Sequence, residues 1–307
     1  MTDRGDKRAT ILCAGGAVQD IIMRVEKFPQ AGSKVQASAF LVTSGGQSGN
    51  AAVAAARLGA GTLYAGTLGG RDDKVATEIL GALAREGIDC SGAVRVPGAT
   101  SSVSLIMLDA DGEKMIATRR DSGLSETMPP DPQALVQRVD AVLADNRYPN
   151  FVTPICQAAR ARKIPCVLDF DKSTPFDDPL LALSTHVIAS ADALRDATGL
   201  KELPAALKTM SESVGCFLAV TEGPAGLYWL EHGEVRHMAA FKIEAVDTLG
   251  AGDAFHGAFT VRLVETGDEV EAMRFASAAA AIKCTRFGGL TGAATRAEVE
   301  KLLQRPA

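Results

Sequence analysis

The stretch from Val246 to Phe259, VDTLGAGDAFHGAF, is a run of small residues that leads through one acid, Asp253, into a helical pattern. One interpretation is that Asp253 caps the helix, because aspartate is among the best N-terminal caps and the apolar residues that follow form a core-facing stripe. A second interpretation starts from Gly250, Ala251 and Gly252, whose bare backbone lets an anion approach successive N–H groups at the helix start.

An acid beside such an anion hole would repel a static anion. The pairing fits chemistry in which Asp253 takes a proton from a hydroxyl group while the amides stabilise charge on a transferred phosphoryl group. The stretch contains no GxxxxGK[ST] P-loop, and Gly250, Gly252 and Gly257 lack the spacing of a dinucleotide-binding fingerprint. The pattern therefore indicates a phosphoryl-transfer site at a helix start.

Length and charge set the wider limits. The 307 residues can form one large α/β domain with a small appendage. The net charge of −5 gives no electrostatic case for nucleic acid or an anionic membrane as a partner. The start lacks the apolar run of a signal peptide, and no segment approaches about 18 unbroken apolar residues. The six scattered cysteines include no CxxC pair, which is typical of free thiols in a reducing compartment. We therefore expect a cytoplasmic protein.

Strand-like and helical segments alternate along most of the chain. The strand candidates TLYAGTLG, DAVLAD, CVLDFD, HVIAS and FLAVTEG have helical stretches between most of them. This alternation predicts a largely parallel sheet covered by helices, with ligands at the carboxyl ends of its strands. We expect Asn50 to open, as an N-cap, a helix of very small residues that Gly59 ends.

Two segments break this alternation. Ser33–Ser44, SKVQASAFLVTS, alternates like a half-exposed strand, and Ser101–Arg120 reads as a hairpin with Asp111-Gly112 at its turn. Together they predict a small β-lobe beside the ligand end of the main sheet, where it can act as a lid. We expect residues 1–307 to form a single domain, with lid segments near 18–44 and 98–121.

A second glycine-rich stretch, GGQSGNAAVAAARLGA from Gly45 to Ala60, precedes DTLGAGDAFHGAF in the chain. These two stretches, in this order, resemble the two signature segments of the PfkB (ribokinase-like) family of sugar and nucleoside kinases. The resemblance runs from about Ile11 to Leu303. It implies an α/β fold with a doubly wound, mainly parallel sheet flanked by helices and a small β-sheet lid. It also implies ATP-dependent phosphorylation of a sugar hydroxyl.

The resemblance assigns roles to particular residues. It implies that Asp253 is the catalytic base and that the small residues before it form the anion hole. It implies that the sugar is held by Asp20, Gly45, Gly46 and Asn50. It places ATP near VTEGPAGLYWL, where the residues that match the family's nucleotide-side turn are Thr221, Gly223 and Gly226. Such a turn can also be a plain hairpin connection.

The metal sites of the family are only partly matched. The family usually carries Asn-x-x-Glu where this chain has Ser190 and Ala193, so the usual acid that organises magnesium waters is missing. Magnesium is still expected, to neutralise ATP. Carboxylates at strand ends could take over through water, or could be only caps and solvated charges: Asp169, Asp171 and Asp192. Many members also bind potassium near the anion hole, where this chain has Asp247 and the segment Cys284–Gly289.

Basic residues gather on the predicted lid side, at Lys34, Arg119, Arg120 and Arg147. They would suit a sugar with an anionic substituent, although lid charges are often only solvated. Stretches such as VLADNR, VLDFD and RFASAAAAIKCTRFGG are most similar to the sulfofructose kinase branch of the family. That similarity implies that Lys34 and Arg147 hold the sulfonate of 6-deoxy-6-sulfofructose, with Thr118 where the branch has Asn.

Alternatives remain for substrate and class. The substrate alternative is a neutral sugar, namely fructose, another ketohexose or ribose. The alternative of another class is a non-catalytic sugar or nucleotide sensor, which the intact Asp253 and its glycine run disfavour. We also expect a homodimer formed through the lid. No role is assigned to the histidines, and His256, one turn beyond Asp253, reads as an ordinary solvent-facing side chain.

Overall fold

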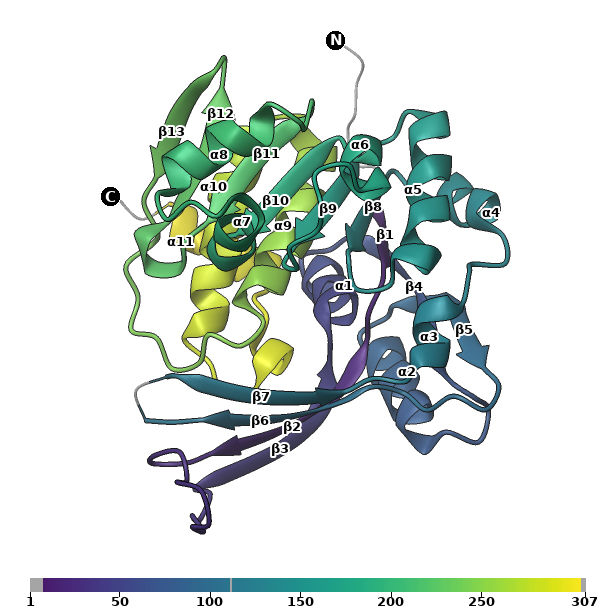
Figure 1. The fold of residues 1–307 in the computed structure, drawn as a ribbon, viewed down its shortest axis with the longest axis vertical. Helices are drawn as coiled ribbons and strands as arrows, with labels where there is room; N and C mark the ends of the chain where they lie inside the picture. The colour runs from purple at the N-terminus through teal and green to yellow at the C-terminus, as the bar shows by residue number, and fades with distance from the viewer. Residues whose placement is uncertain (1–7, 111, 305–307) are drawn as a thin grey trace.

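The computed structural model describes residues 8–110 and 112–304, and in this part a nine-stranded sheet forms the centre of the molecule (Figure 1). The strand order is β13-β12-β11-β10-β9-β8-β1-β4-β5, parallel except for the antiparallel edge β12 and β13. The strands are β1 (Thr10–Ala14), β4 (Gly61–Gly69), β5 (Asp89–Val96), β8 (Ala141–Asp145), β9 (Cys166–Phe170), β10 (His186–Ser190), β11 (Phe217–Thr221), β12 (Leu227–Glu231) and β13 (Glu234–Met238). The order reverses between β1 and β8, which is where doubly wound sheets bind ligands.

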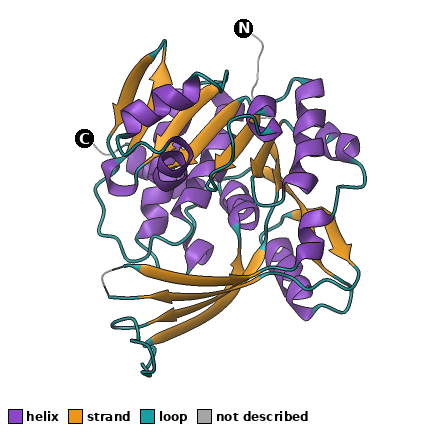
Figure 2. Ribbon diagram, in the orientation of Figure 1, coloured by secondary structure: helices purple, strands orange, loops and turns teal. Residues whose placement is uncertain are grey.

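Helices cover both faces of this sheet (Figure 2). One layer consists of α1 (Gln47–Arg57), α2 (Lys74–Arg85), α9 (Ala251–Thr266), α10 (Glu269–Cys284) and α11 (Arg296–Leu303). The other consists of α3 (Ser122–Glu126), α4 (Pro132–Gln137), α5 (Pro149–Arg162), α6 (Pro179–Leu183), α7 (Ala191–Thr198) and α8 (Leu203–Ser211). Alternate residues of each buried strand enter the two cores: Ile11 and Cys13 pack in the first, Leu12 and Ala14 in the second. The predicted α/β fold is confirmed.

A separate four-stranded sheet projects from the main domain as the lid (Figure 1). Its order is β3-β2-β6-β7, with β2 (Val18–Arg24), β3 (Ala39–Gly45), β6 (Val103–Leu108) and β7 (Lys114–Arg119). β6 and β7 form the predicted antiparallel hairpin. Of the predicted turn residues, Gly112 has a φ of 84°, and Asp111 lies outside the described residues.

The strand predicted from Ser33 begins later than expected. β3 starts at Ala39, opposite Arg24, the last residue of β2. Residues before Ala39 have no neighbouring strand to pair with, so they form a loop in spite of their alternating pattern. Lys34 is therefore an exposed loop residue and not part of a lid strand.

Both glycine-rich helix starts differ from the predicted caps. α1 begins at Gln47 with Gly46 as its N-cap, and α9 begins at Ala251 with Gly250 as its N-cap. The two glycines have φ values of 85° and 77°, which let the chain turn into each helix earlier than the polar residue expected to cap it. Neither Asn50 nor Asp253 is a cap, and both side chains are free for other contacts.

The helices α1 and α9 pack closely against each other. A Cβ atom at Gly257 would lie 2.5 Å from the carbonyl oxygen of Ala51 and 3.0 Å from the Cβ of Ala54. The small residues of both helices therefore serve a close approach of two backbones. This approach brings the first turn of α1 next to the first turn of α9. Within the described residues, no helix combines the length and apolar character needed to cross a membrane.

Candidate active site

A pocket of about 370 Å³ lies between the carboxyl edge of the central sheet and the lid, a volume in the range of small-molecule sites. Main-domain helix starts and strand ends line one side, and β2, β6 and β7 of the lid line the other. The predicted residues that line it are Asp20, Gly46, Asn50, Thr118, Arg147, Asp169, Asp171, Thr221, Gly250, Ala251, Gly252 and Asp253. Those outside the lining are Lys34, Gly45, Asp192, Gly223, Gly226 and Asp247.

Asp253 lies in the first turn of α9 and points toward α1. Its Oδ2 accepts a hydrogen bond of 2.7 Å from Nδ2 of Asn50. Burial, and then the nearby charge of Asp169, raise the pKa of Asp253 to about 7, while the Asn50 hydrogen bond and His256 oppose the rise. The amides of Gly252 and Asp253 make no hydrogen bond to the rest of the described chain, so this helix start retains open donors.

Asp20 is a second buried acid, contributed by the lid strand β2. Burial, and then the charge of Asp253, raise the pKa of Asp20 to about 7, while a hydrogen bond with Ser104 opposes the rise. Gly45 explains how this acid fits, because a Cβ at Gly45 would lie only 1.8 Å from Oδ2 of Asp20. Gly45 therefore makes room for Asp20 without lining the pocket itself.

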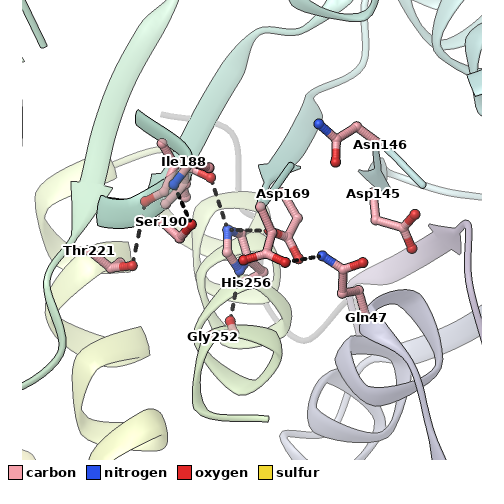
Figure 3. Close-up of polar contacts among 12 residues, drawn as sticks. Gln47, Asp145, Asn146, Asp169, Ile188, Ser190, Thr221, Gly252 and His256 are labelled. Carbon is pink, nitrogen blue, oxygen red and sulfur yellow. Dashed lines mark hydrogen bonds and ion pairs between the residues drawn. The ribbon is translucent and has the colours of Figure 1, made fainter. Parts of the chain in front are cut away.

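His256 is buried and not solvent-facing, so that reading of the sequence is wrong. Its helix face is covered by the ends of β9 and β10, as Figure 3 shows. Nδ1 lies 2.7 Å from the carbonyl oxygen of Gly252, and Nε2 lies 3.2 Å from that of Ile188 and 3.5 Å from Oδ1 of Asp169. Both ring nitrogens face oxygen acceptors, so the ring joins the first turn of α9 to the ends of β9 and β10.

Asp169 and Asp171 extend from the end of β9 toward the pocket. Burial is the main reason that the pKa of Asp169 is raised well above its usual range, and Asp171 and Asp145 add to the rise. Asp171 accepts hydrogen bonds from Nη2 of Arg147 at 2.5 Å and from Nε2 of Gln47 at 3.2 Å. Arg147 also donates through Nε to Oε1 of Gln47 at 2.8 Å, which closes a small polar ring.

Asp145, which the sequence reading did not single out, joins three segments at the point where the strand order reverses. Its Oδ2 accepts from the amide of Gly16 at 2.7 Å and from Oγ of Ser48 at 2.6 Å, and its Oδ1 accepts from the amide of Arg147 at 3.0 Å. A Cβ at Gly15 would lie 2.2 Å from this carboxylate. The signal in the sequence was an acid that closes the apolar strand AVLAD.

On the nucleotide side, Thr221 lines the pocket beside Ser190, its partner on β10. Gly223 and Gly226 shape the turn between the antiparallel strands β11 and β12, with φ values of 50° and 99°. A Cβ at Gly226 would lie 2.1 Å from the carbonyl oxygen of Met238. Gly223 and Gly226 are therefore explained by the backbone conformation and close packing of the turn. Of the three residues, only Thr221 lines the pocket.

Ser190 and Ala193, which stand where the family usually has Asn-x-x-Glu, have structural roles in this chain. The hydroxyl of Ser190 caps α7 by accepting from the amide of Ala193, and Ala193 is buried. Asp192 does not line the pocket: its side chain is 97% exposed, and its Oδ1 lies 3.8 Å from Nη1 of Arg195. The described residues contain no cluster of three or more His, Cys, Asp or Glu side chains that could hold a metal ion. Magnesium usually needs only one or two carboxylates besides phosphates and water, so Asp169 and Asp171 suit it chemically.

Comparison with known proteins identifies the family and the fold. Residues 8–296 match the model of the pfkB family carbohydrate kinase. The chain is 32% identical to the ribokinase of Bacillus subtilis (strain 168), over 95% of this chain and 99% of that protein. A crystal structure of a putative ribokinase from Agrobacterium tumefaciens superimposes with a TM-score of 0.92 at 37% identity, covering 97% of this chain and 98% of that one. For Arabidopsis thaliana ribokinase complexed with ribose and ATP, the TM-score is 0.83 at 25% identity, covering 98% and 100%.

The fold and the site define a phosphotransferase that acts on a sugar hydroxyl and uses ATP. The chain belongs to the pfkB family of carbohydrate kinases. The resemblance seen in its two glycine-rich stretches is thereby confirmed, and the sensor alternative gives way to an enzyme.

Proposed function

We propose that this kinase phosphorylates a sugar that carries an anionic substituent, with 6-deoxy-6-sulfofructose as the expected ketohexose. The observation that supports the proposal is the gathering of three basic side chains, Lys114, Arg120 and Arg147, around the same pocket as Asp20 and Asp253. Within the described residues, Lys114 and Arg120 make no ion pair. A neutral sugar offers such cations no partner, whereas a sulfonate or phosphate does.

The cationic set differs from the one expected from sequence. Lys34 lies in a loop outside the lining, and the Thr118 hydroxyl is hydrogen-bonded to Ser104 at 3.0 Å. Lys114 stands on the same face of β7 as Thr118, four residues away, and takes the place that we had given to Lys34. Arg147 uses Nε and Nη2 in its ring with Gln47 and Asp171, so its two Nη1 donors remain for a ligand.

For the chemical step we propose that Asp253 is the general base. Asn50 fixes its carboxylate at the helix start, where open amides can stabilise charge on the transferred phosphoryl group. Asp20 faces it from the lid and would accept hydrogen bonds from other sugar hydroxyls. The raised pKa of Asp253 suits a base that must accept a proton near neutral pH.

A neutral sugar, ribose or fructose, is the second candidate. It is favoured by the ion pair between Arg147 and Asp171 at 2.5 Å, which already neutralises one of the three cations. Similarity to ribokinases also points in this direction. In this case Lys114 and Arg120 would be solvated lid charges.

We propose that Asp169 and Asp171 are the acids that hold magnesium, through water, in place of the missing family acid. Both line the pocket at the end of β9, while Asp192 does not. Magnesium, when bound, neutralises the phosphate charge of ATP. The high pKa of Asp169 reflects its burial among other acids, which is the environment that a divalent cation relieves.

We also propose a homodimer that forms through the outer face of the lid. Strand register places Ile21, Val42, Leu105 and Ala117 in one row across the sheet, and the next row contains Met23, Phe40, Met107 and Met115. Phe40 is 63% exposed and Met115 is 48% exposed. An apolar face of this kind is uncommon on a monomer and is typical of an interface.

The base is tested by Asp253→Asn. The amide keeps the shape of the side chain but cannot accept the hydroxyl proton, so kcat should fall by at least about 10²-fold while sugar binding persists. In the wild type, kcat/KM should fall as the pH drops below about 7, because Asp253 then becomes protonated. Near-normal kcat in the variant would exclude this residue as the base.

The anionic substrate is tested by comparing kcat/KM for 6-deoxy-6-sulfofructose, fructose and ribose. Arg120→Ala and Arg147→Ala should each lose about ten- to hundredfold with the sulfosugar, because a hydrogen bond between charged groups contributes roughly 1.5–3 kcal/mol. Losses with fructose should be small. Arg119→Ala is the matched control, since Arg119 pairs with Asp121 outside the pocket lining. Wild-type preference for a neutral sugar, or equal losses on all sugars, would favour the second candidate.

The magnesium acids are tested by titrating Mg²⁺ at fixed sugar and ATP. Asp169→Asn or Asp171→Asn should raise the Mg²⁺ concentration needed for half-maximal rate more than it raises the sugar KM. Asp192→Asn is the control, because that side chain is exposed on α7. Unchanged titrations in both test variants would remove these acids from the role.

The dimer is tested by light scattering. The wild type should have twice the mass of the 32.0 kDa chain, and Phe40→Lys should reduce it toward the monomer. Met128→Lys is the matched control, since Met128 is also 63% exposed but follows α3 and belongs to none of the four lid strands. A monomeric wild type, or a dimer that survives Phe40→Lys, would contradict the lid interface.

A further inference from the structure

Lys283, near the end of α10, is fully buried behind the start of α9. Its Nζ donates a hydrogen bond of 2.7 Å to the carbonyl oxygen of Asp247 and lies 3.6 Å from Oδ2 of the same residue. Lysine is almost never fully buried unless it is paired. The ammonium group of Lys283 therefore forms a buried charge pair with Asp247, in the segment that leads to Gly250.

Asp247 holds that segment in place. Its Oδ1 accepts from the amide of Leu249 at 2.8 Å, and its Oδ2 accepts from the amides of Gly288 at 2.9 Å and Gly289 at 3.2 Å. Asp247 is only 2% exposed. One carboxylate thus fastens the turn before the proposed anion hole to the loop after α10.

This region does not suit a potassium ion, although the family resemblance placed one here. Both carboxylate oxygens of Asp247 already accept amides, and its carbonyl oxygen accepts the ammonium group. The carbonyl of Cys284 accepts the amides of Val246 at 2.8 Å and Asp247 at 3.1 Å, and that of Gly288 accepts from Thr291. The single carboxylate is also neutralised, so a second cation would meet the charge of Lys283 at close range.

We propose that the Lys283 ammonium group is a built-in replacement for a monovalent cation. It neutralises Asp247 and holds the entry to the anion hole, so turnover needs no potassium. The expected effect on turnover rests on the proposed anion hole at Gly250–Gly252. The replacement of a cation by Lys283 rests only on its buried pair with Asp247. Burial lowers the pKa of Lys283, and the charge of Asp247 acts in the opposite direction, as expected for a desolvated ammonium group kept in place by a carboxylate.

The first test uses the wild type and a sugar that it phosphorylates. Its kinase activity should be the same in potassium chloride and in choline chloride of equal ionic strength. The melting temperature should also be the same in the two salts, because an ion that binds only the folded state would raise it. A potassium requirement, or a potassium-specific rise in melting temperature, would overturn the proposal.

The second test uses Lys283→Ala, which leaves space and an unpaired carboxylate. In choline the variant should lose activity and melt at a lower temperature, and potassium should restore part of both. Lys283→Met fills the space without charge, so potassium should not restore it. Lys301→Ala, an exposed lysine on α11, is the control and should respond like the wild type. If Lys283→Ala matches the wild type in choline, or folds but gains nothing from potassium, Lys283 replaces no ion.

The two readouts, kinase activity and melting temperature, distinguish a failure of this proposal from a failure of the proposed function. Melting temperatures report on the cation site even if none of the tested sugars is phosphorylated, a result that would instead count against the substrate assignment. If Lys283→Ala does not fold in either salt, the wild-type comparison still decides whether potassium is needed.

Discussion

The carboxylate of Asp145 is the contact on which the arrangement of the site depends. It binds the backbone after β1, the first turn of α1 and the backbone after β8, three segments that meet where the strand order reverses. Asn50 and Gln47 stand on the helix that it anchors, and Arg147 follows it by two residues. The price of this anchor is a glycine at position 15, since any side chain there would overlap the carboxylate. One buried acid therefore holds together the three segments that form this end of the pocket.

Several buried carboxyl groups lie close together in the pocket near Asp145. Asp20, Asp169 and Asp253 all have raised pKa values, mainly because they are buried. A raised pKa means that the folded protein binds protons which the unfolded chain releases. For Asp20 and Asp253 this contribution to stability is complete below the ordinary aspartate pKa and is lost as the pH rises through about 7. At the pH where the base must be ionised, the empty pocket is thus destabilised, and ligands that bring positive charge or hydroxyl donors offset the repulsion.

The order of strands and helices could be predicted from sequence because hydrophobic alternation and glycine stops are local signals. The family resemblance carried by the two glycine-rich stretches also placed Asp253, Asn50 and Asp20 around one pocket. Helix starts were misjudged because a glycine with positive φ replaced the side-chain cap. Lys34 was misplaced because strand pairing depends on where the partner strand ends. The burial of His256 and the ring of Arg147 with Asp171 and Gln47 depend on contacts between distant segments, which no local pattern encodes.

The hydrogen bond between Asn50 and Asp253 spans 203 residues of chain. During synthesis the first turn of α1 is complete long before α9 exists, so no partial chain that ends before α9 can contain the site. Until the C-terminal helices are made, α1 and α2 cover only part of one face of the central sheet, and the small-residue side of α1 lacks the contact with α9. Contacts of such long sequence separation are slow to form and expose apolar surface in the meantime. The site therefore requires both ends of the chain, because Asn50 and Asp253 meet only when α9 packs against α1.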